Sequence, residues 1–222
     1  MTKHIQRQTE ILKQKILYVG TLVEEAIAKA IAALINRDAA LAKKVIDADN
    51  DIDRMEVDVE EECLKILALY QPVAADLRFV VAVLKINNDL ERMGDLAQNI
   101  AKRVVYLSKA DPMDLPIDFR SMAAKSQVMV KQSLDALVNS DAALARQVRG
   151  EDDEVDRARQ QIRDQIMEAI RKHPTRVEYL LKLNSVSKHL ERLADMATNV
   201  AEDVIYMVEG EIVRHLRTTE PF

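Results

Sequence analysis

The chain has 222 residues and a net charge of −5, with acidic and basic residues mixed throughout. Because no run of like charges marks a nucleic-acid face, we expect no binding to DNA or RNA. The low content of glycine (4 residues), proline (5 residues) and aromatic residues (4%) favours long helices over sheets.

Residues 3–36 are predicted to form the first helix. Its apolar side chains recur in steps of three and four, which places them on one helical face: Leu12, Ile16, Val19, Val23, Ile27, Ala30 and Leu34. The sequence at residues 1–10 has no apolar segment typical of a secretory signal, and the longest apolar run, residues 79–84, is too short to cross a bilayer. We therefore expect a cytoplasmic protein that reaches a membrane only through partners.

A second helix is predicted to start after Asp38, whose carboxylate can cap it, and to end before Pro72. Its expected apolar stripe is Leu41, Val45, Ala48, Ile52, Met55, Val59, Cys63 and Ile66. Since Cys63 is the only cysteine, no intrachain disulfide can form, and we interpret it as a small buried hydrophobic residue.

A third helix is predicted to start at Pro72, with Asp76 in its first turn. Its expected stripe is Ile86, Leu90, Met93, Ala97, Ile100 and Val104. Residues 109–116 follow, and two prolines in this short polar stretch indicate a linker.

The second half of the chain repeats the first. NRDAALAKKV at Asn36 matches NSDAALARQV at Asn139, and LERMGDLAQNIA at Leu90 matches LERLADMATNVA at Leu190. We therefore predict an all-α fold of two tandem antiparallel three-helix bundles, residues 1–108 and 117–222, joined by the linker at 109–116.

Four acidic pairs with i, i+4 spacing lie at repeat-related positions: Asp49/Asp53, Glu91/Asp95, Asp152/Asp156 and Glu191/Asp195. Residues at this spacing share a helical face. Other acidic pairs, such as Asp47/Asp51 and Asp114/Asp118, show the same spacing, so the spacing by itself also fits a solvated helix surface.

The distances of these acidic pairs from the helix turns favour a common binding site over a solvated helix surface. Asp53 precedes Pro72 by the same number of positions as Glu91 follows it. If the two helices fold back there, both pairs lie at one level, about 28 Å from the turn. In the second half, Asp156 and Glu191 lie at nearly equal sequence distances on either side of Pro174.

Four neighbouring carboxylates repel one another unless protons, arginines or a cation compensate. In one interpretation, the adjoining Arg54, Arg92, Arg157 and Arg192 pair with the acids on a polar surface. In the other, the carboxylates hold a divalent or ferric cation, with Asn99 and Asn199 as additional oxygen ligands. Glu24 is a further candidate at a similar level, although the second half has Ser126 and Gln127 in the place of Glu24 and Glu25.

We do not expect an enzyme. The sequence has no glycine-rich phosphate loop, no hydrolase nucleophile motif, and no Glu-x-x-His pair of the kind that holds a di-iron site.

The string QPVAADLR at Gln71, followed by LERMGDLAQNIA, resembles the PhoU family of phosphate-uptake regulators, and the likeness extends along the whole chain. The resemblance implies a negative regulator of phosphate uptake and of the phosphate-starvation response. Its implied partners are the ATPase subunit of the phosphate ABC transporter and the phosphate-sensing histidine kinase. The sequence leaves open whether the protein is a monomer or a homodimer.

The resemblance also implies metal clusters (iron, zinc, magnesium or manganese) at motifs that match the four acidic pairs. One departure is Ala194, which replaces the glycine found at position 94 in the first copy. Two alternatives stay open from the residues alone: a metal-storage or metal-redox protein, and a helical scaffold without metal.

Overall fold

The computed structural model of the protein describes residues 3–213. It contains six α-helices and a 3₁₀ turn at Pro174–Arg176, and no strand occurs in this range, which confirms the all-α prediction. The helices are α1 (Lys3–Asn36), α2 (Ala39–Tyr70), α3 (Ala74–Leu107), α4 (Phe119–Asn139), α5 (Ala142–Lys172) and α6 (Val177–Glu209).

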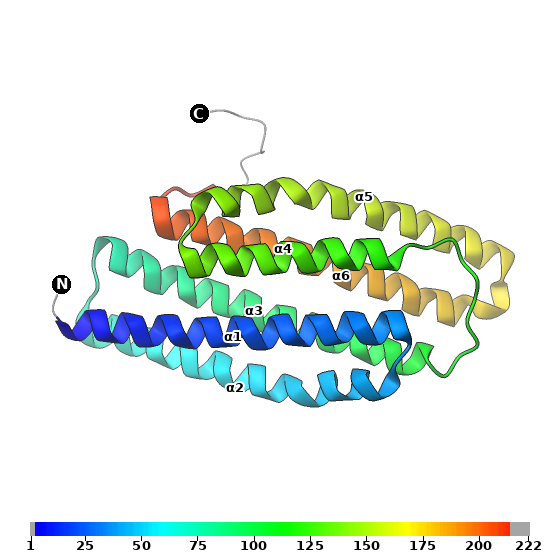
Figure 1. Ribbon diagram of the computed structural model, residues 1–222, viewed down its shortest axis with the longest axis horizontal. Helices are drawn as coiled ribbons and strands as arrows, with labels where there is room; N and C mark the ends of the chain where they lie inside the picture. The colour runs from blue at the N-terminus through cyan, green and yellow to red at the C-terminus, as the bar shows by residue number, and fades with distance from the viewer. Residues whose placement is uncertain (1–2, 214–222) are drawn as a thin grey trace.

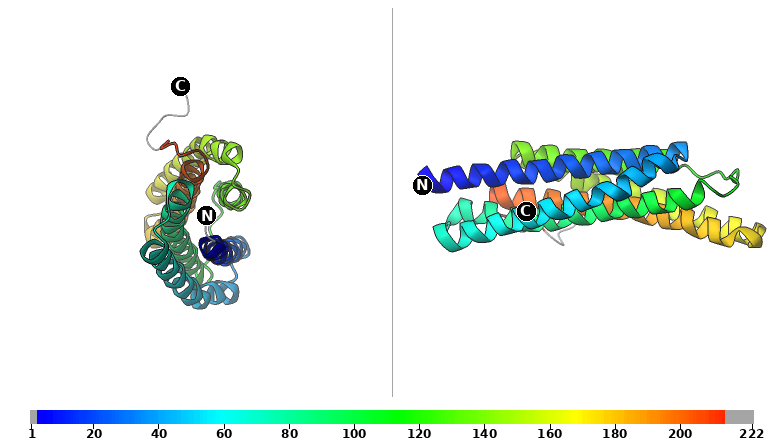
Figure 2. Two further views of the ribbon diagram at one scale, coloured as in Figure 1. Left: turned by 90° about the vertical axis from the view of Figure 1, so that its left-hand side faces the viewer. Right: turned by 90° about the horizontal axis from the view of Figure 1, so that it is seen from below.

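The helices form two layers. Four long helices lie side by side in the order α2, α3, α6 and α5, while α1 and α4 cover one face of this layer (Figures 1 and 2). Helices α1–α3 form one antiparallel bundle and α4–α6 the other, as predicted. The two bundles pack along each other mainly through the antiparallel helices α3 and α6.

Equivalent caps start the second helix of each bundle. The carboxylate of Asp38 accepts hydrogen bonds from the backbone N–H groups of Ala40 and Leu41, both at 2.9 Å, as predicted. Asp141 makes the same contacts at the start of α5. Helix α3 starts at Ala74 rather than at Pro72, because Pro72 and Val73 form the extended turn that precedes it.

One position of the predicted apolar stripe on α2 is wrong. Ala48 is exposed, and Asp49, with 8% of its surface exposed, takes the inward position instead. The buried residues of α2 therefore follow alternating steps of three and four through Val45, Asp49 and Ile52. Cys63 is buried as predicted, and burial raises the pKa of its thiol to about 12.

The linker between the bundles, residues 108–118, is held by two arginines from helix turns. The guanidinium of Arg37, between α1 and α2, donates to the carbonyls of Leu107 and Ala110. Arg176, between α5 and α6, donates to the carbonyl of Asp111. None of the helices in the described part of the chain has an apolar stretch sufficient to span a membrane.

Candidate metal centre

The two acidic pairs predicted in the first bundle lie on neighbouring turns of α2 and α3, and their charges interact. Burial raises the pKa of Asp49 to about 6, and the charges of Asp53 and Asp95 add to this effect. Burial likewise raises the pKa of Glu91, with further contributions from Asp95 and Asp53. We call Asp49, Asp53, Glu91 and Asp95 the first cluster.

The second bundle repeats this arrangement on α5 and α6. Burial raises the pKa of Asp152 to about 6, and the charges of Asp195 and Asp156 raise it further. The pKa of Asp195 also rises to about 6, because of burial and then because of Glu191 and Asp156. Asp152, Asp156, Glu191 and Asp195 form the second cluster.

The packing of α3 against α6 brings both clusters to the same level. Nζ of Lys85 lies 3.4 Å from Oδ1 of Asp203, and Nε of Arg103 donates to Oγ of Ser185 at 3.2 Å. The midpoint of these two contacts is residue 94 on α3 and residue 194 on α6. An approximate twofold axis therefore passes there, and the two clusters flank it across the four-helix layer.

A pocket of about 330 Å³ lies on this axis between α3 and α6, and both Asp95 and Asp195 line it. The sequence predicted that the acidic pairs share a level within each half. It did not predict that the two halves share one level, with a common pocket between them.

The cluster residues fit hard cations. Arg54 pairs with Asp51 rather than with the first cluster, at 3.7 Å, and Arg157 donates to the backbone carbonyl of Asp153. Oδ1 of Asp152 is buried without a hydrogen-bond partner. Carboxylate oxygens grouped in this way suit magnesium, manganese, zinc or ferric ions.

The hydrogen bonding around the clusters differs between the halves. In the first half, Nε2 of Gln98 donates to Oδ2 of Asp49 at 2.5 Å. At the equivalent place in the second half, Oγ1 of Thr198 is buried without a partner, as is Oδ1 of Asp152. Within residues 3–213, no group of three or more His, Cys, Asp or Glu side chains is arranged so that it could hold a metal ion.

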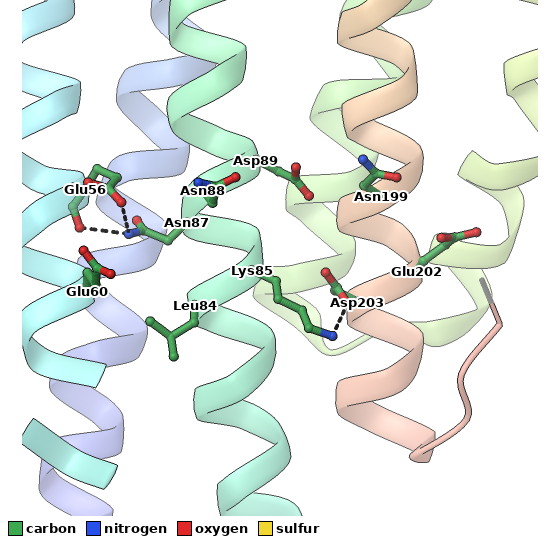
Figure 3. A pocket seen from close by; sticks show the side chains of 10 residues that line it. All are labelled: Glu56, Glu60, Leu84, Lys85, Asn87, Asn88, Asp89, Asn199, Glu202 and Asp203. Atoms are coloured by element: carbon green, nitrogen blue, oxygen red, sulfur yellow. Dashed lines mark hydrogen bonds and ion pairs between the residues drawn. The ribbon is translucent and has the colours of Figure 1, made fainter. Parts of the chain in front are cut away.

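The secondary candidates are separated from one another. Asn99 lines the pocket on the twofold axis. Asn199 instead lines a larger pocket of about 630 Å³ across α2, α3 and α6, together with Glu56 and Asp89 (Figure 3). Glu24 lies on α1, which belongs to the other layer, and it is not among the charges that shift the pKa of either cluster.

Sequence reasoning missed two residues beside the clusters. Glu56 lies about two helical turns after Asp49, and burial together with Glu60 and Asp53 raises the pKa of its carboxyl. The equivalent residue in the second half is Arg159, whose Nε lies 3.5 Å from Oε2 of Glu191. The signal was present in the sequence, because aligning the repeats sets a glutamate against an arginine at this position.

Gly94 serves helix packing. A Cβ at this position would lie 3.0 Å from Cδ1 and 3.3 Å from Cγ2 of Ile52 on α2. In the second half, Ala194 has the extra methyl group, and Val155 stands at the position equivalent to Ile52. The extra methyl group of Ala194 thus stands opposite a smaller partner side chain.

Comparison with known proteins matches the PhoU domain twice, at residues 16–104 and 119–204. The chain is 39% identical to a phosphate-specific transport system accessory protein PhoU homolog of Aquifex aeolicus, over 96% of this chain and 97% of that protein. It is 36% identical to the homolog of the same description from Pseudomonas aeruginosa, over 99% and 93% of the two chains.

Two solved structures share the fold. The crystal structure of PhoU from Pseudomonas aeruginosa superposes with a TM-score of 0.90 at 35% identity, covering 93% of this chain and 99% of that one. The phosphate transport system regulatory protein PhoU from Streptococcus pneumoniae gives a TM-score of 0.86 at 30% identity, covering 94% and 99%.

Proposed function

The chain belongs to the PhoU family, and on this premise we propose that it is an accessory regulator of a phosphate-transport system. The observation that supports this most is the full-length likeness to phosphate-specific transport system accessory proteins, which includes both repeats. In this role the protein lowers phosphate uptake and keeps the phosphate-starvation response off when phosphate is abundant.

The protein acts by contact, as an adaptor between the ATPase subunit of the phosphate transporter and the phosphate-sensing histidine kinase. The four-helix layer supports this role, because it offers a long surface (Figure 2), and its helices carry exposed charged residues such as Asp53 and Arg192. Cations held by the first and second clusters supply positive charge to this surface. The cluster carboxylates orient those cations and set the net charge that a partner meets.

Deletion of the gene tests the regulatory role. We expect phosphate-starvation genes to be expressed in phosphate-rich medium, and we expect the intact gene to restore their repression. A reporter for these genes measures the effect. Repression that persists in the deletion strain would rule out a negative regulator.

A pull-down against the transporter ATPase and the kinase, with and without phosphate, tests the adaptor role. We expect capture of both partners and a change in the captured amount when phosphate is added. If neither protein is captured, with or without phosphate, the adaptor role is wrong.

Metal content tests the clusters separately. Substitution of Glu91 and Asp95 by Ala removes half of the first cluster, so we expect elemental analysis to show less bound metal per chain. The double variant Asp47→Ala/Asp51→Ala is a matched control, because this pair has the same spacing on α2 but both residues are exposed. Equal metal content in both variants would show that the cluster carboxylates are not metal ligands but part of a solvated helix surface.

A further inference from the structure

The pocket on the approximate twofold axis has a composition that the carboxylate clusters do not explain. Each half of the chain contributes one arginine to it, Arg92 from α3 and Arg192 from α6. The complete lining is Arg92, Asp95, Leu96, Asn99, Arg192, Asp195 and Met196. A volume of about 330 Å³ is in the range of small-ligand sites.

Among residues 3–213, neither guanidinium group has a fixed hydrogen-bonded partner, although the charge of Arg192 partly offsets the rise in the pKa of Asp195. Within the described residues, no hydrogen bond and no ion pair involves the side chain of Arg92 or Arg192. By contrast, Arg103 on α3 donates to Ser185, and Arg159 on α5 forms an ion pair with Glu191. Two guanidinium groups without a hydrogen-bonded partner among these residues therefore line one pocket, one from each side of the axis.

Guanidinium groups present planar forks of N–H donors that match the paired oxygens of oxyanions. One arginine from each half, with the amide of Asn99 beside them, suits a small anion that has oxygens on several sides. Carboxylates alone would repel such a ligand, and Asp95 and Asp195 line the same pocket. The pocket thus becomes attractive to an anion only when cations hold the carboxylates of the flanking clusters.

We propose that this pocket binds a phosphoryl oxyanion, bridged between Arg92 and Arg192, when the two flanking clusters hold cations. The inference rests on the proposed metal role of the clusters and deepens the proposed function, because it gives the phosphate signal a binding place in the chain itself. A ligand on the axis contacts both repeats at once. Its binding therefore depends on the charge state of both clusters.

Equilibrium dialysis with radiolabelled inorganic phosphate tests the site, using full-length protein loaded with Mn²⁺ and protein stripped by a chelator. We expect one phosphate per loaded chain and none on the stripped protein. Arg92→Gln and Arg192→Gln should each weaken binding by about tenfold, the loss expected for a charge-assisted hydrogen bond. Arg54→Gln is the matched control, because Arg54 is exposed beside the first cluster but does not line the pocket.

Metal content and thermal unfolding of the same samples separate the possible failures. The arginine variants should keep their metal and their Tm, since both side chains are exposed. Loaded protein that binds no phosphate, or that binds it equally well in both arginine variants, would overturn the oxyanion site and leave the metal clusters standing. Wild-type protein that takes up no metal would overturn both.

A second arm distinguishes the two sources of the oxyanion. A phosphoserine peptide competes with labelled phosphate in the same dialysis. Displacement at a lower concentration than unlabelled phosphate assigns the pocket to a phosphorylated partner, and preference for the free ion assigns it to phosphate itself. Both results support the site.

Discussion

Asp49 and Asp152 occupy positions where the helix pattern places a hydrophobic residue. On α2, Asp49 lies between the buried Val45 and Ile52, and Asp152 has the same place between Val148 and Val155 on α5. A carboxylate there loses water on folding, which disfavours its charged form. The rise of both pKa values to about 6 reflects this cost, which the metal-free protein bears at neutral pH.

Asp152→Asn should therefore stabilise the metal-free protein at pH 7.5, raising Tm by about 3 °C. A carboxyl whose pKa is raised on folding contributes stability that is present below its unfolded pKa and is lost as pH rises through the folded value, here from 3.8 to about 6. The gain from the substitution should thus shrink at pH 4.5. Circular dichroism melting at both pH values, in the presence of a chelator, measures the effect.

Asp47→Asn is the control for this experiment, because it removes an exposed carboxylate on the equivalent helix α2. It should leave Tm almost unchanged at both pH values. A Tm for Asp152→Asn that falls at pH 7.5 would mean that the carboxylate stabilises the metal-free fold.

At this scale, sequence reasoning named the eight cluster residues but not their environments. The i, i+4 spacing and the distances from Pro72 and Pro174 were sufficient to pair the acids. The inward position of Asp49 was missed, because an alanine beside it fits an apolar stripe equally well. The contact of Gln98 with Asp49 could not be predicted, since side chains that meet across two helices leave no periodic signal in either helix.

At the scale of the helices, the close approach of α2 to α3 depends on one pair of side chains. Gly94 makes room for Ile52, and the second half uses Ala194 with Val155 at the same positions. The two side chains of each pair thus have nearly the same combined volume, but the second half moves one methyl group from the α2-type helix to the α3-type helix. Close-packed interiors require such matched changes.

A double-mutant cycle tests this matching. Gly94→Ala alone should lower the free energy of unfolding by about 1 kcal/mol, because the contact at 3.0 Å outweighs the higher helix propensity of alanine. Adding Ile52→Val should restore stability to the wild-type level or above it, with a coupling of about 1–2 kcal/mol. Urea denaturation of the four proteins measures the cycle.

The mirrored exchange in the second half, Ala194→Gly with Val155→Ile, is the matched control and should show coupling of the same sign. Additive effects in both halves would show that the two positions do not share a packing constraint.

The helices themselves were largely predictable. Apolar steps of three and four, the cap at Asp38 and the prolines at the turns indicated all six of them. The lateral order α2, α3, α6, α5 was not predictable in the same way. Helix α3 has apolar residues that pack on α1, while its contacts with α6 include polar pairs such as Lys85 with Asp203, which a hydrophobic pattern does not reveal.

At the scale of the whole molecule, the two halves share a backbone arrangement but differ in charge. Beyond the first cluster, α2 carries Glu56 and Glu60, and the equivalent residues of α5 are Arg159 and Arg163. The first cluster therefore has acidic neighbours where the second has basic ones. We expect the first cluster to bind cations more tightly.

Glu56→Arg tests this expected difference in affinity, because it gives the first cluster an arginine like Arg159 beside the second cluster. In a background with Asp152→Ala and Asp195→Ala, which leaves only the first cluster, Mn²⁺ affinity should fall by about tenfold at low salt. Isothermal titration calorimetry measures the affinity. Glu61→Arg, an equal charge change at an exposed position of α2, should have a much smaller effect. Equal losses in the two variants would point to net charge rather than to local contact.

The hydrogen bonds from Arg37 and Arg176 to the linker affect how a partner protein recognises this molecule. Since Arg37 and Arg176 fasten the linker to turns of both bundles, and α3 packs along α6, the halves have no free joint about which to swing. If the clusters hold cations as proposed, we expect their uptake or release to alter the electrostatic potential of one broad face while the outline of the molecule stays constant. A charged partner would respond chiefly through its rate of association, which depends on long-range attraction and falls as ionic strength rises.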